Sequence, residues 1–462
     1  MASITFHGAA RTVTGSKYLL EADGQQVLVD CGLFQGLKEL RQKNWDATPF
    51  SVKALDAVVL THAHLDHIGY LPRIVRQGFK GPVYCTEATH ELAEIILLDS
   101  AKIQEQDAEY ANRKGYSKHK PALPLYETRD VETAMKLFRD VPREEWFSPT
   151  VAVRMRYHDA GHLLGSTMIE TEIDGGPKPL RILFSGDVGR YQGPLYHDPV
   201  PPPECDYLVC ESTYGDREHP EKDILQSLEG VVRRSVERGG AMIMAAFAVG
   251  RAQQLIYLLQ ILKSQDRIPD LPIFLDSPMA CDATAVYREH FDEHDLSEAD
   301  LDPAHPALAG RKVILARTAN ESKAINQTKG PSVIISSSGM MTGGRILHHL
   351  RQRLPSERNT IVIGGYQAPG TRGRLLQEGA RSLKMYGMEV PVRAAIETIP
   401  GLSGHADRSD LVRWLGQLKS PPRRTFLTHG EPQAMNALAE ELQKTRNWEV
   451  HCPFLGEKIQ LT

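Results

Sequence analysis

The feature that most constrains this chain is a run of ligand-type side chains directly after an apolar segment. Residues 61–67 read Thr-His-Ala-His-Leu-Asp-His and follow the apolar run 57–60. The run predicts a strand that ends at a sheet edge, where several side chains can converge on one point. Imidazole nitrogens with a carboxylate oxygen suit Zn²⁺ best, with Mn²⁺ or iron as competitors. The fold must therefore present His62, His64, Asp66 and His67 to a metal.

These four residues are too few to complete the ligand sets of two metal ions. Further ligands are therefore expected at other strand ends. His162, Asp187 and His429 each stand beside a glycine after an apolar run. That position allows a side chain to be aimed at a buried ion. Taken singly, each is explained better as a structural loop residue, and only the combination points to a metal centre.

Length and pattern predict more than one domain. The chain has 462 residues with an ordinary globular composition, 41% hydrophobic and 24% charged, and a domain takes about 100–200 residues. Short strands are predicted over the first 90 residues. Residues 90–140 are predicted to be helical, with an exposed basic loop between Tyr110 and Pro124. From about residue 216 strands alternate with helices, which is typical of a parallel sheet. After this point helices are predicted at 223–238, 251–265, 283–290, 409–418 and 432–445. Strands are predicted at 241–245, 273–276, 333–336, 360–363, 392–396 and 424–428.

Targeting and redox signals are missing from the sequence. The six cysteines form no CxxC pair, which argues against a disulfide framework and a cysteine-based zinc ribbon. The amino terminus has no basic region followed by an apolar one, and no apolar run reaches about 18 residues. We therefore expect a cytoplasmic protein that does not associate with membranes.

Charge is distributed unevenly although the net charge is only -4. Residues 264–305 hold 11 acidic and 2 basic residues, whereas residues 311–393 hold 14 Lys or Arg and 4 Glu. The second block is a candidate surface for a polyanion, because Lys and Arg supply most of the non-specific affinity for nucleic acid. A solvated face explains the same charges equally well.

The motifs carry a family resemblance. Asp30, the run 62–67, His162 and Asp187 resemble, in order and spacing, the four motifs of the metallo-β-lactamase superfamily. After Asp187 the chain is similar to the β-CASP metallonucleases, relatives of the nuclease subunit of the cleavage and polyadenylation factor. The stretches that match its motifs A, B and C are 210–216, 403–407 and 427–430, and the further matching stretches are 246–251, 276–280, 338–344 and 365–371. The resemblance spans essentially the whole chain.

The resemblance implies the architecture. It predicts an α/β protein with an αββα metallo-β-lactamase fold over residues 1–215 and 396–462 and an inserted α/β β-CASP domain over residues 216–395. The metals are expected at the floor of a cleft between the two. From the resemblance we expect neither the amino-terminal KH-type region of the archaeal relatives nor the carboxyl-terminal extension of RNase J.

The resemblance also implies the site. Two Zn²⁺ ions per chain are expected, with Mn²⁺ as an alternative. The first would be held by His62, His64 and His162, the second by Asp66, His67 and His429, and Asp187 would bridge them. Asp30 would orient a ligating histidine. Asp66 could also aim the attacking hydroxide, and His405 backed by Glu211 would protonate the leaving group.

The predicted substrate is RNA. In this family a histidine at motif C, here His429, accompanies RNA-processing members, whereas valine accompanies DNA-repair members. Single-stranded RNA is the expected substrate. Endonucleolytic cleavage is favoured over 5′-to-3′ exonucleolytic trimming, which stays open as a second mode. Candidate substrate contacts in the inserted domain are Ser337, Ser338, Gly339, Arg345 and Arg372, although a plain turn also explains the glycine-rich stretch.

Alternative functions remain open at this point. A DNA nuclease uses the same phosphate chemistry, and a thioester, lactam or phosphonate hydrolase also uses an HxHxDH run. A non-catalytic partner subunit is disfavoured because all seven ligand positions and His405 are present. The sequence is compatible with a homo-oligomer and identifies neither the biological RNA nor its sequence preference.

Overall fold

The computed structural model describes residues 2–462 except 116, 118, 175–177, 220–222, 297–307, 309–311, 366 and 400. The chain divides into two compact units. The first unit comprises Met1–Gln192, Asp198–Glu218 and His405–Thr462, and the inserted unit comprises Gly193–His197 and His219–Gly404. Lys118, Arg311, Tyr366 and part of the acidic block 264–305 lie outside the described residues.

The first unit is built on two facing sheets, each of seven strands in the described part of the chain. One has the order β22-β1-β2-β3-β4-β5-β6 and the other β21-β20-β11-β10-β9-β8-β7. The strands of the first sheet are β1 (Ala2–Phe6), β2 (Tyr18–Ala22), β3 (Gln25–Val29), β4 (Ala57–Val59), β5 (Val83–Cys85), β6 (Phe138–Asp140) and β22 (Lys458–Leu461). Those of the second are β7 (Trp146–Phe147), β8 (Val153–Asp159), β9 (Thr167–Ile173), β10 (Leu180–Phe184), β11 (Tyr207–Glu211), β20 (Arg424–Thr428) and β21 (Val450–His451).

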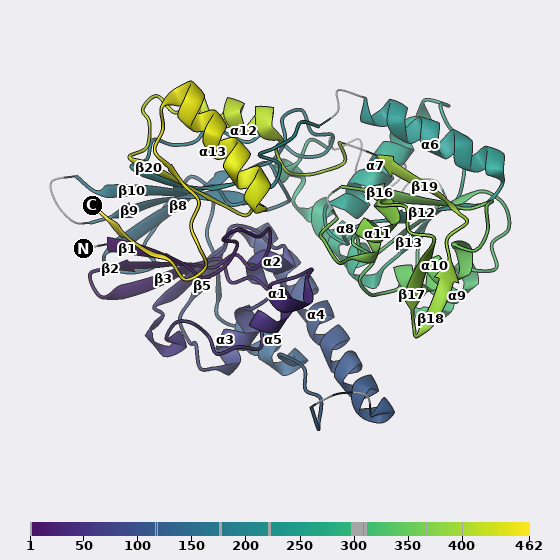
Figure 1. Cartoon of the computed structure of the whole chain (residues 1–462), viewed down its shortest axis with the longest axis horizontal. Coiled ribbons are helices and arrows are strands. Elements are labelled where there is room, and N and C mark those ends of the chain that lie inside the picture. Colours follow the sequence, from purple (N-terminus) through teal and green to yellow (C-terminus); the bar gives the residue numbers. More distant parts are fainter. Residues whose placement is uncertain are drawn as a thin grey trace. The chain divides into compact units, whose positions relative to one another are not determined.

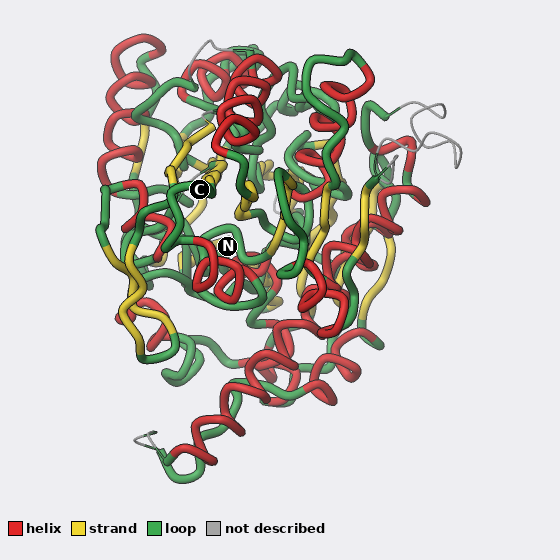
Figure 2. The backbone as a smooth tube through the Cα atoms, turned by 90° about the vertical axis from the view of Figure 1, so that its right-hand side faces the viewer, coloured by secondary structure: helices red, strands yellow, loops and turns green. Residues whose placement is uncertain are grey.

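Apolar side chains from both sheets form the core between them, with Phe6, Phe184 and Phe426 fully buried. Helices cover the outer faces, so the first unit has four layers, αββα, as predicted (Figure 1). On one side lie α1 (Lys38–Lys43), α2 (Leu65–Ile68), α3 (Leu71–Arg76), α4 (Glu87–Lys114) and α5 (Thr128–Met135), and on the other α12 (Arg408–Leu415) and α13 (Pro432–Arg446). The carboxyl half of the long helix α4 projects beyond the sheets (Figure 2).

The inserted unit is a doubly wound α/β domain. Its parallel sheet has the order β14-β13-β15-β12-β16-β19. The strands are β12 (Ala241–Ala245), β13 (Ile273–Asp276), β14 (Val313–Leu315), β15 (Ser332–Ser336), β16 (Thr360–Gly364) and β19 (Ala395–Ile399). Helices α6 (Ile224–Arg238), α7 (Arg251–Ser264) and α8 (Pro278–Glu289) pack on one face. Helices α9 (Ala319–Ile325), α10 (Ile346–Arg353) and α11 (Arg372–Gln377) pack on the other, with the hairpin of β17 (Ser382–Met385) and β18 (Met388–Pro391).

Several predicted boundaries shift. The strand predicted at 392–396 is β19, which pairs with β16 and therefore groups residues up to Gly404 with the inserted unit. The helix predicted at 283–290 begins at Pro278, where Ser277 caps it. Helix α4 extends to Lys114, so the basic loop is shorter than predicted. None of the helices in the described residues combines the length and apolar character of a membrane-crossing segment.

A buried ionic network holds the carboxyl edge of the inserted sheet. Asp276, at the end of β13, is fully buried. One carboxylate oxygen accepts from Arg345 Nη1 (2.7 Å), and the other accepts from His349 Nε2 and Ser322 Oγ (both 2.6 Å). Arg345 also donates to the carbonyls of Ala316 and Arg317. Loops after β13 and β14 are thus tied to α9 and α10.

Replacing the central carboxylate should destabilise the protein. Asp276→Ala removes the carboxylate that Arg345 and His349 share, and loss of one partner from a buried ion pair costs about 3–5 kcal/mol. Urea unfolding followed by circular dichroism measures this. The control is Asp282→Ala, which breaks a half-exposed pair with Arg317 and should cost at most about 1 kcal/mol. Equal unfolding midpoints for the two variants would contradict a stabilising network.

Candidate metal centre

Parallel strands bring the predicted ligands to one edge of the first unit. Strands β3 and β4 run parallel, so Asp30 and the 61–67 segment follow neighbouring strand ends. Strands β10, β11 and β20 are also parallel and deliver Asp187, Glu211 and His429 to the same edge of the second sheet. His162 lies in the turn between β8 and β9. The two sheets therefore supply separate halves of one site.

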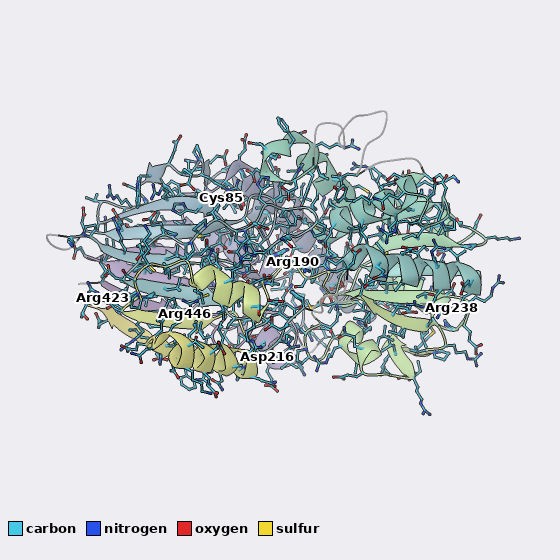
Figure 3. The ribbon with its side chains drawn as sticks, turned by 90° about the horizontal axis from the view of Figure 1, so that it is seen from above. Cys85, Arg190, Asp216, Arg238, Arg423 and Arg446 are labelled. Atoms are coloured by element: carbon cyan, nitrogen blue, oxygen red, sulfur yellow. The ribbon has the colours of Figure 1, made fainter. Side chains whose placement is uncertain are left out.

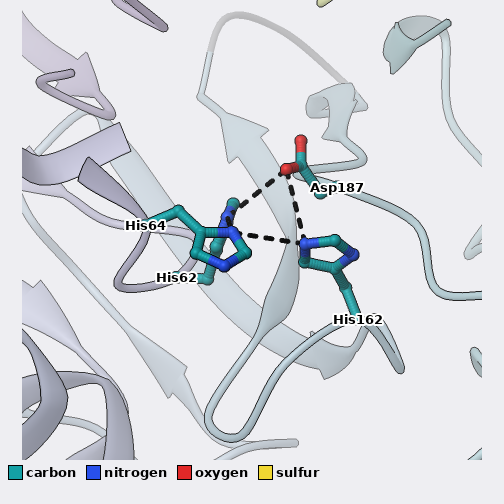
Figure 4. Close-up of side chains that lie close together, drawn as sticks. All are labelled: His62, His64, His162 and Asp187. Carbon is teal, nitrogen blue, oxygen red and sulfur yellow. Dashed lines mark hydrogen bonds and ion pairs between the residues drawn. The ribbon is translucent and has the colours of Figure 1, made fainter. Parts of the chain in front are cut away.

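The first cluster contains His62, His64, His162 and Asp187 (Figure 4). His64 Nδ1 lies 3.0 Å from His62 Nε2 and 3.3 Å from His162 Nε2. Asp187 Oδ2 lies 3.4 Å from His62 Nε2 and 3.6 Å from His162 Nε2. Three imidazoles and one carboxylate oxygen thus face a common point.

The second cluster contains Asp66, His67 and His429. His429 Nε2 lies 3.3 Å from both His67 Nε2 and Asp66 Oδ2. The other oxygen of Asp187, Oδ1, lies 3.4 Å from His67 Nε2 and 3.6 Å from His429 Nδ1. Asp187 therefore directs one oxygen toward each cluster, and the residues group in the two sets that the resemblance implies.

Neighbouring side chains orient the imidazoles. Asp30 Oδ2 accepts from His67 Nδ1 (2.8 Å), and Asp30 Oδ1 accepts from the backbone N–H of Thr61 (2.8 Å). Thr213 Oγ1 lies 3.0 Å from His429 Nδ1, which leaves Nε2 facing the cluster. Asp30 and His429 both have positive φ, 58° and 48°, an uncommon backbone region that is concentrated at functional sites. Asp30 thus lies outside both clusters, where an orienting residue belongs.

The backbone beneath the ligands is clamped by a segment that sequence reasoning missed. Ser16 N–H donates to Asp66 O, and Cys31 N–H donates to His67 O. At Gly32 a Cβ would lie 1.5 Å from Asp66 O, so only glycine permits this approach. The buried Lys17 donates to the carbonyls of Gly15 and Gly32 and so joins the two loop segments that form the clamp. A lone lysine in an apolar strand carries no sequence signal for this role.

Burial and charge set the protonation of the cluster. Burial, together with the neighbouring His67, lowers the pKa of His62 to about 3. Burial also lowers the pKa of His64 to about 4 and that of His162 well below its ordinary value. Burial alone would raise the pKa of Asp187, but the surrounding histidines hold it well below its usual range. Neutral imidazoles and an ionised carboxylate are the forms that bind metals. His67 differs, because Asp187 and Asp30 overcome the effect of burial and raise its pKa well above the ordinary value, so it must release a proton to bind a metal.

The donor set fits divalent metal ions. Ligands at about 2.0–2.1 Å from a tetrahedral ion stand about 3.3 Å apart. The ligand-atom separations given above lie between 3.0 and 3.6 Å, and all ligand atoms within a cluster lie within 4.8 Å of one another. Asp187 Oδ1 is buried and has no hydrogen-bond partner. An ionised oxygen buried among histidine nitrogens in this way needs a cation.

His405 lies beside the clusters. Its Nδ1 is 3.1 Å from Oε1 of the buried Glu211, which also accepts from Val188 N–H. Burial would lower the pKa of His405, but Glu211 and Asp187 raise it to about 9. The imidazole is 19% exposed. The motif-A stretch that supplies Glu211 ends at Asp216, which is labelled in Figure 3. Asp216 pairs with Arg217 at 2.7 Å.

The predicted substrate contacts lie in the inserted unit and have internal partners. Ser337 Oγ donates to Ser277 Oγ, and Ser338 Oγ accepts from the N–H of Thr342. Gly339 O accepts from the Gln367 amide. Arg345 belongs to the Asp276 network. Arg372 donates to the carbonyls of Met341, Thr342 and Lys384. The arginines hold loops together here, and their contact with a substrate stays a prediction.

Comparisons with known proteins identify the family. The metallo-β-lactamase superfamily model matches residues 11–219, the Beta-Casp domain model residues 252–376, and the model of a Zn-dependent metallo-hydrolase RNA specificity domain residues 389–453. Ribonuclease TTHA0252 of Thermus thermophilus is 38% identical over 98% of both chains. The chain belongs to the β-CASP family of the metallo-β-lactamase superfamily. The predicted resemblance is thus confirmed, and with it a divalent-metal site.

Other relatives extend this β-CASP assignment. Transcription termination factor FttA of Methanocaldococcus jannaschii is 31% identical over 99% of this chain and 71% of its own length, and FttA of Pyrococcus abyssi is 32% identical over similar shares. A crystal structure of an Enterococcus faecalis protein of unknown function aligns over the whole chain with a TM-score of 0.52 at 14% identity. At that identity the likeness shows the fold alone.

The role of Asp30 can be tested through metal affinity. Asp30→Asn removes the charge that orients His67, and loss of such a partner typically lowers metal affinity about 10–100-fold. Chelator competition with Zn²⁺ measures the change. Asp46→Asn, at an exposed position, is the control and should bind Zn²⁺ as the unmodified protein does. An unchanged affinity in Asp30→Asn would rule out the orienting role.

Proposed function

We propose that this protein is a metal-dependent ribonuclease that uses two zinc ions to hydrolyse phosphodiester bonds of single-stranded RNA. The observation that carries the proposal is the Asp187 carboxylate shared by two buried donor clusters, with the His405–Glu211 pair beside them. Full-length similarity to a protein named as a ribonuclease supports the substrate class. The RNA specificity domain model over residues 389–453 supports it further.

Each residue has a defined task in this proposal. His62, His64, His162 and Asp187 would hold one ion, and Asp66, His67, His429 and Asp187 the other. When bound, such ions make water a nucleophile near neutral pH and neutralise charge on the phosphate. Asp66 accepts a hydrogen bond from the attacking water and orients it.

His405 acts on the leaving group. A departing ribose oxygen is a strong base and needs a proton. Glu211 holds Nδ1 of His405 and keeps the ring protonated. The imidazolium then transfers its Nε2 proton to the oxygen. Endonucleolytic cleavage is the proposed mode.

The first test is a panel of end-labelled substrates with metal-replete protein: single-stranded RNA, the same RNA as a perfect duplex, and the matching single-stranded DNA. We expect cleavage of single-stranded RNA, slower cleavage of the duplex and none of the DNA. Asp66→Ala removes a proposed metal ligand and should lower the rate of RNA cleavage more than removal of a ligand-orienting residue, which costs about 10–100-fold in activity. If protein shown to carry two ions cuts no strand, the proposal fails and esters and thioesters become the substrates to try. Product lengths distinguish internal cutting from trimming.

The role of His405 can be tested with two substrates, one whose leaving group needs a proton and one whose leaving group does not. His405→Ala should slow RNA cleavage by about 10²–10⁴-fold, because the leaving oxygen loses its proton donor. Bis(p-nitrophenyl) phosphate has a leaving group that needs no proton, so its hydrolysis should change little. Bound metal, measured by mass spectrometry, should be unaltered. Equal losses on both substrates would mean that His405 supports the metal centre instead of acting as an acid.

A further inference from the structure

An aromatic–basic patch lies at the turn of the β17–β18 hairpin in the inserted unit, next to α10 (Figure 1). The patch consists of Tyr386, His348, Arg351, Arg372 and Lys384. Tyr386 is 51% exposed although it is a large aromatic residue. His348, Arg351 and Lys384 are exposed as well.

The Tyr386 ring is held in place despite its exposure. Beneath it, Leu383, Met385 and Val390 anchor the hairpin in the apolar core. The ring stacks on His348, with centroids 5.2 Å apart and planes 24° from parallel. The phenol oxygen lies 3.2 Å from His348 Nε2. A ring ordered before binding loses little entropy when a ligand stacks on it.

The backbone at Tyr386 is unfavourable for its residue type. The two turn residues have φ of 51° at Tyr386 and 79° at Gly387. Such turns favour Asn, Asp or Gly at the first position, because a bulky side chain disfavours the left-handed region. Tyrosine at this position weakens the turn and exposes an apolar ring, so folding does not account for it. Strain of this kind points to a functional site.

Positive charge surrounds the ring. The Arg351 guanidinium lies 5.5 Å from the ring centroid. Arg372 Nε donates to the carbonyl of Lys384. Burial raises the pKa of Tyr386, and Arg351 and Arg372 oppose that rise. The nearest acidic group in the hairpin is Glu389, which stands opposite Lys384 and bonds to Ser382 Oγ. The patch therefore carries more positive than negative charge.

We propose that this patch is a stacking platform for an unpaired base of the RNA substrate, a binding site additional to the metal centre. Proteins that bind single strands combine aromatic rings, on which bases stack, with basic groups that contact phosphates. Tyr386 supplies the ring, and Arg351 and Lys384 supply charge for the flanking phosphates. The inference rests on the proposed ribonuclease function and adds a contact that favours unpaired strands, since a paired base cannot leave its stack without cost.

The decisive variant is Tyr386→Asn. Asparagine removes the ring but suits the left-handed turn, so the protein should melt at the same temperature as the unmodified protein or higher. Its KM for a long single-stranded RNA should rise at least about fivefold, because stacking of one base contributes about 1–3 kcal/mol. Its kcat, and its hydrolysis of bis(p-nitrophenyl) phosphate, should stay unchanged. Tyr386→Phe keeps the ring and should behave like the unmodified protein.

A matched control is Tyr110→Ala on α4. Tyr110 is 47% exposed and has Arg113 5.4 Å from its ring, but it belongs to the first unit and has no strained turn. Its KM for RNA should not change. If Tyr386→Asn has an unchanged KM while the unmodified protein cuts RNA, the platform is refuted and the ribonuclease proposal stands. If the unmodified protein cuts no RNA, the proposed function fails and the platform fails with it.

Discussion

The structure depends on one buried carboxylate. Asp187 lies among five histidines and is almost fully excluded from solvent. A charge in that position is costly unless cations or hydrogen-bond donors compensate it. Its two oxygens point to different clusters, and Oδ1 has no hydrogen-bond partner. Positive charge near both oxygens stabilises this ionised carboxylate, and the surrounding histidines or bound divalent metal would provide it.

Both sheets of the first unit provide residues that surround this carboxylate. One sheet provides the 61–67 segment and Asp30, and the other provides His162, Asp187, Glu211 and His429. The apolar core between the sheets keeps these halves in register, because side chains such as Phe6 and Phe426 pack against each other across it. The backbone contacts of Gly32 and the buried Lys17 then fix the ligand-bearing turn. Metal affinity is therefore linked to the packing of the whole first unit.

Among the described residues, the candidate metal ligands all belong to the first unit, and the inserted unit is proposed to bind RNA. The loops after β13 and β14 of this unit are joined by the Asp276 network, in which Arg345 pairs with Asp276. The exposed chemistry lies elsewhere, at the Tyr386 turn. A rigid ring beside arginine and lysine is suited to hold a flexible strand, whereas the metal centre of the first unit is suited to break it.

Local patterns in the sequence were enough to predict much of the molecule. The HxHxDH run, the strand-end positions of His162, Asp187 and His429, and the alternating elements after residue 216 predicted the sheets and the candidate ligands, because strand periodicity and ligand type are local properties. Motif resemblance added the pairing of His405 with Glu211. The sequence missed the Lys17 clamp and the internal hydrogen bonds of Arg345 and Arg372, because the partners of a charged side chain are set only after the chain has folded.

What the sequence by itself determined is the set of chemical groups and their order along the chain. Which oxygen of Asp187 faces which cluster, and that an exposed tyrosine stacks on His348, were decided by tertiary structure. Both depend on distances between residues far apart in the sequence, such as Asp66 and His429 or His348 and Tyr386. Such distances follow from the packing of sheets and helices, which no local pattern encodes.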